Sequence, residues 1–207
     1  MPKGSEELTS ARKEEIINAC AKLYETMNFK DVTIKEIGKA TSFTRTSIYN
    51  YFQTKEEIFL AYMQREYEVW IAALRQMRTA HETMGRKEFA EVLAHSLEER
   101  GNLLKLMAMN HYDMEENSRM ERLVEFKVIY GRALAEMQNC LEYFFPEMTV
   151  QKRQEFLFSF FPFMFGIYPY TVVTEKQREA MKLAKVDYIY RSVYELVLAE
   201  VKKLLDV

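Results

Sequence analysis

The amino-acid sequence predicts an all-α protein, and three observations support this. Glycine and proline are rare, at six and four of 207 residues, so few positions interrupt a helix. Apolar residues recur with helical spacing along nearly the whole chain. A Ser or Thr followed three residues later by Glu or Gln is typical of helix starts; it occurs at Thr33, Thr54, Ser118 and Thr174. These signals predict about nine helices.

The expected helices cover most of the chain. Their ranges are about 9–27, 33–40, 44–52, 54–79, 86–100, 102–112, 118–145, 149–168 and 174–205. Pro146 is expected to end the seventh helix, because proline lacks the backbone N–H that a helix needs. Thr149 is expected to cap the eighth.

Residues 33–58 carry the most informative pattern. Two short helices joined by three or four residues are the sequence shape of a helix-turn-helix that reads DNA. In the second helix, Ile48 and Phe52 fall on one face. The rest of its surface is rich in hydroxyl, amide and phenol groups, with Arg45 near its start. Such a surface suits a helix in a DNA groove, where base edges and phosphates are read by hydrogen bonds.

The charge distribution agrees with a local DNA-binding surface. The whole chain has a net charge of −2, whereas residues 30–55 carry five basic and two acidic side chains, a net +3. The remainder therefore sums to −5. A basic patch on an otherwise acidic protein is an electrostatic footprint for nucleic acid.

The pattern over about residues 10–63 resembles the N-terminal domain of the tetracycline-repressor (TetR) family of bacterial transcriptional regulators. The matching positions are Ala19, Leu23, Phe29, Thr33, Ile34, Ile37, Ala40, Phe43-Thr44, Ile48-Tyr49-Asn50-Tyr51-Phe52, Lys55-Glu56-Glu57 and Phe59. The rest of the chain matches in length and helical character. The resemblance implies a three-helix DNA-binding head, residues 1–53, and a helical ligand-binding and dimerisation body, residues 54–207.

Two positions depart from the family pattern. Ser42 and Thr46 stand where the family often has glycine, in the turn and inside the recognition helix. Ser42 is expected to strain the turn slightly, and Thr46 adds bulk where the helix meets the groove. An operator sequence therefore cannot be inherited from the family.

Roles for the head residues follow from the resemblance and from their positions. Thr44, Arg45 and Thr46 are the candidates for base-edge contacts, although Arg45 could instead touch only phosphate. Thr33 and Lys55 lie at helix N-termini, which favour phosphate, although each could serve only as a cap or a solvated charge. Tyr49 and Tyr51 resemble family positions that touch the DNA backbone, although Tyr49 could instead pack on the first helix. Asn50 is a further candidate for DNA contact.

The body contains a dense group of aromatic residues over 156–170 and several methionines. The resemblance implies that the body binds an inducer, and such a lining would suit a small hydrophobic or aromatic molecule. The candidate ligand-binding residues are Met107, Phe126, Phe160, Met164 and Tyr168. An aromatic stripe with helical spacing can equally be closed core.

A homodimer is expected, because one short recognition helix makes few base contacts and two heads reading half-sites about 34 Å apart supply the rest. In the family the last two helices form the dimer bundle. The candidate dimerisation residues are Phe156, Phe163, Ile189, Val193, Leu196 and Val197. This apolar stripe could also pack within its own subunit.

Other classes of protein receive little support. Cys20 and Cys140 have no metal or redox spacing, and the first residues lack a signal-peptide core, which favours the cytoplasm. Residues 156–174 carry no charge, but Pro162, Gly166 and Pro169 disfavour a membrane span. No nucleophile elbow or phosphate loop is present. Neither an enzyme, nor a cofactor, nor a metal site is expected.

The sequence therefore favours a ligand-responsive, sequence-specific regulator of transcription. The resemblance implies a repressor that a small hydrophobic or aromatic inducer releases from its operator. The expected partners are double-stranded DNA with an inverted repeat, a small-molecule inducer and a second copy of the chain. One alternative is a constitutive dimeric DNA-binding protein with a closed core and no effector. Another is a ligand-binding or membrane-associated helical protein whose head does not bind DNA.

Overall fold

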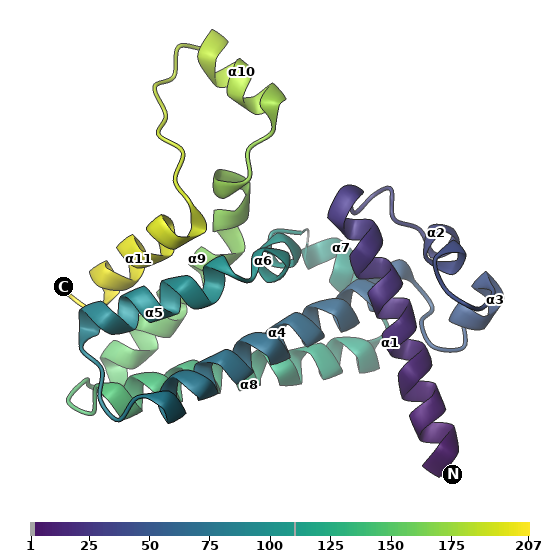
Figure 1. Cartoon of the computed structure of the whole chain (residues 1–207), viewed down its shortest axis with the longest axis horizontal. Coiled ribbons are helices and arrows are strands. Elements are labelled where there is room, and N and C mark those ends of the chain that lie inside the picture. The colour runs from purple at the N-terminus through teal and green to yellow at the C-terminus, as the bar shows by residue number, and fades with distance from the viewer. Residues whose placement is uncertain (1–2, 110) are drawn as a thin grey trace. The chain divides into compact units, whose positions relative to one another are not determined.

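The structure is a computed structural model that describes residues 3–109 and 111–207, and these contain eleven helices and no strand (Figure 1). The helices are α1 Lys3–Thr26, α2 Ile34–Lys39, α3 Arg45–Ile48, α4 Lys55–Ala80, α5 Arg86–Glu98, α6 Gly101–Met107, α7 His111–Glu116, α8 Met120–Phe144, α9 Val150–Thr171, α10 Glu175–Leu183 and α11 Val193–Leu204. The all-α prediction is confirmed. The count exceeds the expected nine because two expected helices are each divided.

The predicted helix 174–205 is wrong as a single element. It ends at Leu183, where Lys185 takes a left-handed backbone conformation with φ 56°. The N–H of Val186 then donates to the carbonyl of Met181, which closes the helix end. A second helix starts after Ser192, whose hydroxyl and backbone N–H form a capping box with Glu195. That Ser-x-x-Glu pattern was readable in the sequence and marks the break.

The predicted caps are mostly confirmed. The side chains of Thr33, Thr149 and Thr174 each accept the backbone N–H three residues on. The capping box at Ser118 is wrong, because its hydroxyl is buried without a hydrogen-bond partner. The backbone N–H of Arg119 instead donates to the carboxylate of Glu57.

The described chain forms two compact units. The first contains residues up to 65 together with 109–129, and the second contains residues 66–108 and 130–207. Both α4 and α8 therefore contribute to each unit. The boundary expected at residue 53 divides the chain by expected function, and it does not coincide with the boundary between the two compact units. The functional division stays a prediction.

The core of the first unit joins the three N-terminal helices to the start of α4. Ile16 and Cys20 of α1, Ile37 of α2 and Ile48 of α3 are fully buried. The ring of Phe59 in α4 lies edge-on to Tyr24 and Phe29, with centroids 5.1 and 4.8 Å away. Aromatic packing thus fixes the head on α4.

The core of the second unit is built mainly by α4, α5, α8, α9 and α11. Trp70 of α4 packs on Phe161 of α9, and α11 packs on both α5 and α9. Glu136 of α8 is buried and is bonded by Arg75 and Arg78 of α4. By contrast, α10 stands away from α9 and α11 and has no buried residue (Figure 1).

Neither α9 nor any other single helix of the described residues is long and apolar enough to cross a membrane. Only α9 and α10 together reach the required length and composition, and they are bent by 82°.

Candidate nucleic-acid interface

The helix-turn-helix is held by a close approach of α2 and α3. A Cβ atom at Gly38 would lie 3.3 Å from the Cα of Arg45, a distance tighter than most real contacts. Ile37 of α2 and Ile48 of α3 are both fully buried where the two helices meet. The glycine therefore lets the start of α3 cross α2 closely.

The turn between these helices is held by side chains. The hydroxyl of Thr41 lies 3.1 Å from the carbonyls of both Gly38 and Phe43. The carboxylate of Glu15 accepts hydrogen bonds from the backbone N–H and the hydroxyl of Ser42. Among the described residues other than glycine, only Lys185 and Asp206 have positive φ. The expected strain at Ser42 is therefore wrong, since this turn needs no left-handed residue there.

The recognition helix presents the predicted polar face. Thr44 caps α3 by accepting the N–H of Ser47. The exposed residues are Thr44, Arg45, Thr46, Tyr49 and Asn50. Ile48 and Phe52 are buried, as their spacing predicted, while Phe43 is half-buried rather than core.

Two polar side chains of this face are already oriented by each other. The Arg45 guanidinium donates to the Tyr49 hydroxyl at 2.9 Å and lies 5.7 Å from the ring centroid. Both residues lie on one turn of the helix, four positions apart. This contact restricts the Arg45 side chain before binding, so less side-chain conformational entropy is lost when Arg45 binds a base or a phosphate.

Tyr51 has a partner that the sequence pattern does not single out. Its hydroxyl accepts a hydrogen bond from Arg12 of α1 at 3.2 Å, and Arg12 is exposed. A cation from α1 thus lies beside the predicted DNA-contacting tyrosine. Only the packing of α1 on the head reveals it, because the two residues are 39 positions apart.

Thr33 and Lys55 occupy the helix starts that the sequence indicates, but their groups are partly engaged. The Thr33 hydroxyl accepts the N–H of Glu36 at 3.2 Å. The Lys55 ammonium donates to the carbonyl of Phe29 at 2.7 Å and lies 4.2 Å from the centroid of its ring. Lys55 therefore ties the loop after α1 to α4, and a phosphate contact by this residue stays a prediction.

A buried carboxylate of α4 joins the segment after the recognition helix to the residue before α8. Glu57 of α4 is fully buried and accepts four hydrogen bonds. Two come from the Arg119 guanidinium at 2.6 and 2.9 Å, and two come from the backbone N–H groups of Gln53 and Arg119. Burial alone would raise the pKa of Glu57, but these donors outweigh it and the net pKa is lowered.

The start of α8 makes further contacts with the same region. Arg122 donates to the carbonyl of Tyr51 at 3.1 Å, and its guanidinium lies 5.6 Å from the ring centroid of Phe52. The Thr54 hydroxyl donates to the carbonyl of Asn117 at 2.8 Å. Residues more than 60 positions away thus support the recognition helix, and no spacing rule in the sequence could have paired them.

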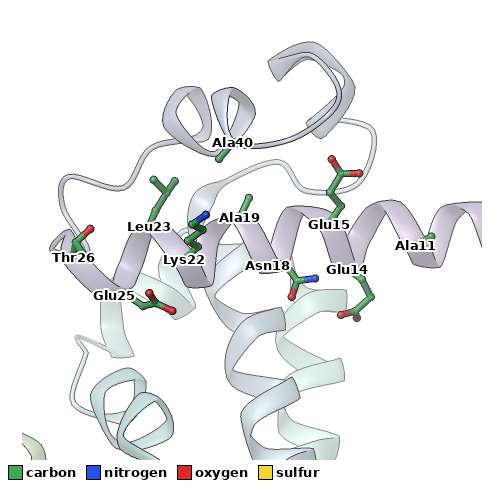
Figure 2. Close-up of a pocket in the computed structure, with 10 residues that line it drawn as sticks. All are labelled: Ala11, Glu14, Glu15, Asn18, Ala19, Lys22, Leu23, Glu25, Thr26 and Ala40. Atoms are coloured by element: carbon green, nitrogen blue, oxygen red, sulfur yellow. The ribbon is translucent and has the colours of Figure 1, made fainter.

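A groove of about 850 Å³ runs along α1 in the same unit (Figure 2). Ala19 and Leu23 of α1 face Ala40 at the end of α2 across it. Its charged lining residues are Glu14, Glu15, Lys22 and Glu25. This net negative lining disfavours phosphate, so the groove is not part of the candidate DNA surface.

The candidate ligand-binding residues fall in both compact units, and their role stays a prediction. Phe126 belongs to the first compact unit and the other four belong to the second. Met107, Phe160 and Met164 are fully buried, and Tyr168 is half-buried. An apolar groove of about 370 Å³ in the second unit has other lining residues, among them Pro162, Gly166 and Tyr170.

The candidate dimerisation residues divide by exposure. Phe156 and Val197 are buried within their own unit, so their side chains are not exposed to another subunit. Ile189 is highly exposed, and Phe163, Val193 and Leu196 are partly exposed. Phe163 and Leu196 also line the apolar groove. The exposed face of α9 and α11 is thus the part available to another subunit.

Comparison with known families accounts for both parts of the chain. Residues 16–62 match the family model described as bacterial regulatory proteins, tetR family. Residues 64–191, more than half of the chain, match the tetracyclin repressor-like C-terminal domain. The chain belongs to the TetR family. The helix-turn-helix and the helical body are thus the two parts of one TetR-family protein.

Individual relatives are distant from this TetR-family chain. The HTH-type transcriptional regulator RutR, from Escherichia coli K12 and from Shigella flexneri, is 25% identical over 69 residues. The match covers 33% of this chain and 32% of RutR. The chain thus spans about a third of the length of the curated relatives that it matches.

Solved structures share the TetR fold over nearly the whole chain. The fatty acid degradation regulator FadR from Bacillus halodurans has 18% identity and a TM-score of 0.57, with 94% of both chains covered. A putative TetR-family regulator from Mesorhizobium loti has 13% identity and a TM-score of 0.59, with 96% of both covered. Thermus thermophilus FadR, in complex with lauroyl-CoA, has 17% identity and a TM-score of 0.55, with 93% of both covered.

Proposed function

We propose that this chain is a homodimeric repressor of transcription that binds an inverted-repeat operator and is released by a small hydrophobic ligand. The exposed polar face of α3 carries the DNA-binding part of this proposal. Thr44, Arg45, Thr46, Tyr49 and Asn50 lie on it. Thr33, Tyr51 and Lys55 complete the candidate surface. Such a regulator acts where the DNA is, in the cytoplasm of a bacterium.

The hydrogen-bonding groups on this face suit contacts with both the base edges and the phosphates of DNA. Arg45 has the planar donor fork that can bond guanine O6 and N7 together. Tyr49, Tyr51 and Arg12 have donors that can reach phosphate oxygens. Base contacts select a sequence, whereas phosphate contacts fix the register of the helix.

A dimer is required by the small size of this surface. One α3 of four residues reads few base pairs, and two copies related by a two-fold axis read two half-sites. The partly exposed apolar residues of α9, of α11 and of the segment before α11 support this assembly. Its candidate contacts are Phe163, Ile189, Val193 and Leu196, with Phe156 and Val197 beneath them.

The ligand part of the proposal rests on the apolar composition of the body and on the structural relatives. Met107, Phe160, Met164 and Tyr168 provide flexible or aromatic surface. One relative with this fold is in complex with lauroyl-CoA. An aliphatic or aromatic molecule is therefore the class of inducer that we propose, with Phe126 as a candidate from the other unit.

A constitutive regulator without an effector is the second candidate. The full burial of Met107, Phe160 and Met164 favours it, because a ligand would have to displace these side chains. Displacing well-packed core residues costs free energy, and methionine adapts most easily. The two candidates differ only in whether a ligand changes DNA affinity.

Selection from a randomised duplex library at fixed salt tests the DNA-binding part. The purified chain is expected to enrich an inverted repeat, with half-sites about one helical turn or a multiple apart. Enrichment of a single half-site would contradict dimeric reading. Salt-sensitive binding without any enrichment would contradict sequence-specific regulation.

Thermal unfolding with lauroyl-CoA, and with coenzyme A alone as the control, tests the ligand part. A ligand that binds the folded chain raises the unfolding temperature in a concentration-dependent way. A shift with lauroyl-CoA alone would support an apolar acyl site. If a series of fatty acids, acyl-CoAs and aromatic compounds all fail, the constitutive candidate is favoured.

A further inference from the structure

The exposed side of α9 has the composition of a buried surface. Phe158 is 76% exposed, and Ser159, Pro162, Gly166 and Tyr170 are also exposed. No residue from 156 to 174 is charged. A large exposed aromatic on an uncharged helix face is typical of an interface with another protein.

A hollow lies on the same side of this helix. The apolar groove of about 370 Å³ is bounded by Pro162, Gly166 and Tyr170 of α9, and by Leu196 of α11. A Cβ atom at Gly166 would meet nothing within 4 Å. The chain itself therefore leaves open space above this glycine, next to large apolar side chains.

We propose that Phe158 of each subunit fills the groove at Gly166 of its partner in the homodimer. This inference rests on the proposed homodimer and assigns its central contact. Each copy supplies one aromatic side chain and one groove, so the contact is made twice.

The spacing along α9 supports this pairing. Phe158 lies four residues before Pro162, and Gly166 lies four residues after it. When two copies of a helix pack antiparallel about a two-fold axis at one residue, positions equally far before and after that residue face each other. An axis at Pro162 therefore places Phe158 opposite Gly166 in both directions. Residues 158, 162, 166 and 170 also form one i±4 row, the ridge used in the commonest helix packing.

A second copy of this chain fits the surface better than an unrelated partner does. The protruding ring and the hollow that can receive it are present on the same face. The face offers no charge that would select a partner of opposite sign. The partly exposed Val193 and Leu196 of α11 continue the apolar surface beside the groove. Self-complementarity of this kind is what a two-fold interface requires.

Engineered cysteines give a direct test of the pairing. The double variant F158C/G166C is expected to form a dimer joined by disulfides on mild oxidation. Within one helix these positions are about 12 Å apart along the axis, too far for an internal disulfide. The single variants F158C and G166C are the matched controls and are expected to remain largely uncrosslinked. The native Cys20 and Cys140 are free and buried, so they contribute little background.

Moving the aromatic ring along the helix tests the same pairing without cysteine chemistry. F158A should weaken the dimer roughly a thousand-fold, because it removes two symmetric contacts, each worth about 30-fold. G166F should also weaken it, since two phenylalanines would then compete for one space. In the double variant F158A/G166F the ring is at position 166 and the open space is at position 158. The same contact can then form in the opposite direction, so most of the dimer affinity should be recovered. Tyr112→Ala, at an exposed tyrosine of the other unit, should leave it unchanged.

Sedimentation equilibrium of the full chain separates the possible outcomes, with circular dichroism to show that each variant is folded. Recovery in the double variant supports the pairing. A wild-type dimer that F158A leaves intact would overturn the pairing but not the homodimer. A wild-type chain that stays monomeric at all concentrations would overturn both. Loss in F158A without recovery in the double variant would show that Phe158 docks elsewhere than at Gly166.

Discussion

Single side chains from outside the recognition helix determine how that helix is held. Tyr49, directly after α3, orients Arg45, whereas Tyr51 is bonded by Arg12 of α1 and by Arg122 of α8. The Gln53 N–H donates to Glu57, so charged groups bond the backbone on both sides of Phe52. A recognition helix of four residues could not keep its orientation from its own hydrogen bonds alone.

Arg45→Ala should relax sequence specificity at one base pair of each half-site. If Arg45 bonds guanine, its loss should remove about 1–3 kcal/mol of discrimination there. Fluorescence anisotropy with the selected operator and its single-base variants measures this. Lys55→Ala removes the candidate phosphate contact at the start of α4 and should weaken all sequences about equally. Equal effects of the two substitutions would assign Arg45 to phosphate instead.

Glu57→Gln should destabilise the fold by about 2–3 kcal/mol at pH 7. Removing one partner of a buried ion pair typically costs about 3–5 kcal/mol, and the exposure of the Arg119 side chain, 39%, reduces this. The lowered pKa of Glu57 means that its ionised form stabilises the folded state. That stabilisation is complete above its unfolded pKa of about 4.3 and is lost as the pH falls through the lower folded value.

Urea unfolding at several pH values checks this prediction. The difference between wild type and Glu57→Gln should be largest at neutral pH and should shrink below about pH 4. Glu121→Gln, at an exposed glutamate of α8, is the control and should change little. A difference that stays constant down to pH 2 would show that the carboxylate charge is not the stabilising feature.

At the level of elements, the crossing of α2 and α3 depends on one small residue. Gly38 brings the two helices together so closely that a Cβ atom would lie 3.3 Å from Arg45. The other contacts of the head, such as the Glu15 bonds to Ser42, position the turn around this crossing. The angle at which α3 is presented therefore follows from the packing at Gly38.

Gly38→Val should separate α2 from α3 and reduce operator affinity more than overall stability. The larger side chain must displace backbone atoms of Arg45, which has no flexible end there to move aside. Gly131→Ala in α8 is the matched control, since its Cβ would meet nothing within 4 Å. Alanine there should stabilise the fold by up to about 1 kcal/mol through helix propensity. Operator titrations and thermal unfolding of both variants give the comparison.

For the whole molecule, the boundary of the two compact units bears on regulation. The recognition helix shares its unit with residues 109–129, the α7 helix and the first part of α8. The same α8 continues into the unit that contains most candidate ligand residues. We therefore expect a change in the body to reach the recognition helix through α8 as well as through α4, by way of Glu57, Arg119 and Arg122.

Ligand and operator should oppose each other by the same factor. A coupling of about 1–3 kcal/mol would lower operator affinity about 5- to 150-fold at saturating ligand, and operator would lower ligand affinity equally. Titration calorimetry with the free and the operator-bound chain measures both directions. Arg122→Ala should reduce this factor if α8 carries part of the coupling. Unchanged operator affinity with a saturating ligand would exclude that ligand as the inducer.

The helical fold, the helix-turn-helix and the polar face of α3 could be predicted from the amino-acid sequence. These follow from local signals: the caps at Thr33 and Thr54, the spacing of Ile48 and Phe52, and the rarity of proline and glycine. Ser192 and Glu195 carried such a signal too, although the break that they mark was not predicted. Local hydrogen bonds and helical periodicity act over a few residues, so a sequence displays them directly.

The packing of the folded chain determines which distant residues meet. Arg119 reaches Glu57 across 62 positions, and Arg12 reaches Tyr51 across 39. It also determines which of the apolar body residues are enclosed, as Phe156 and Val197 are, and which are exposed, as Phe158 and Ile189 are. Periodicity identifies an apolar face but not what covers it, because burial depends on packing between helices that are remote in the chain.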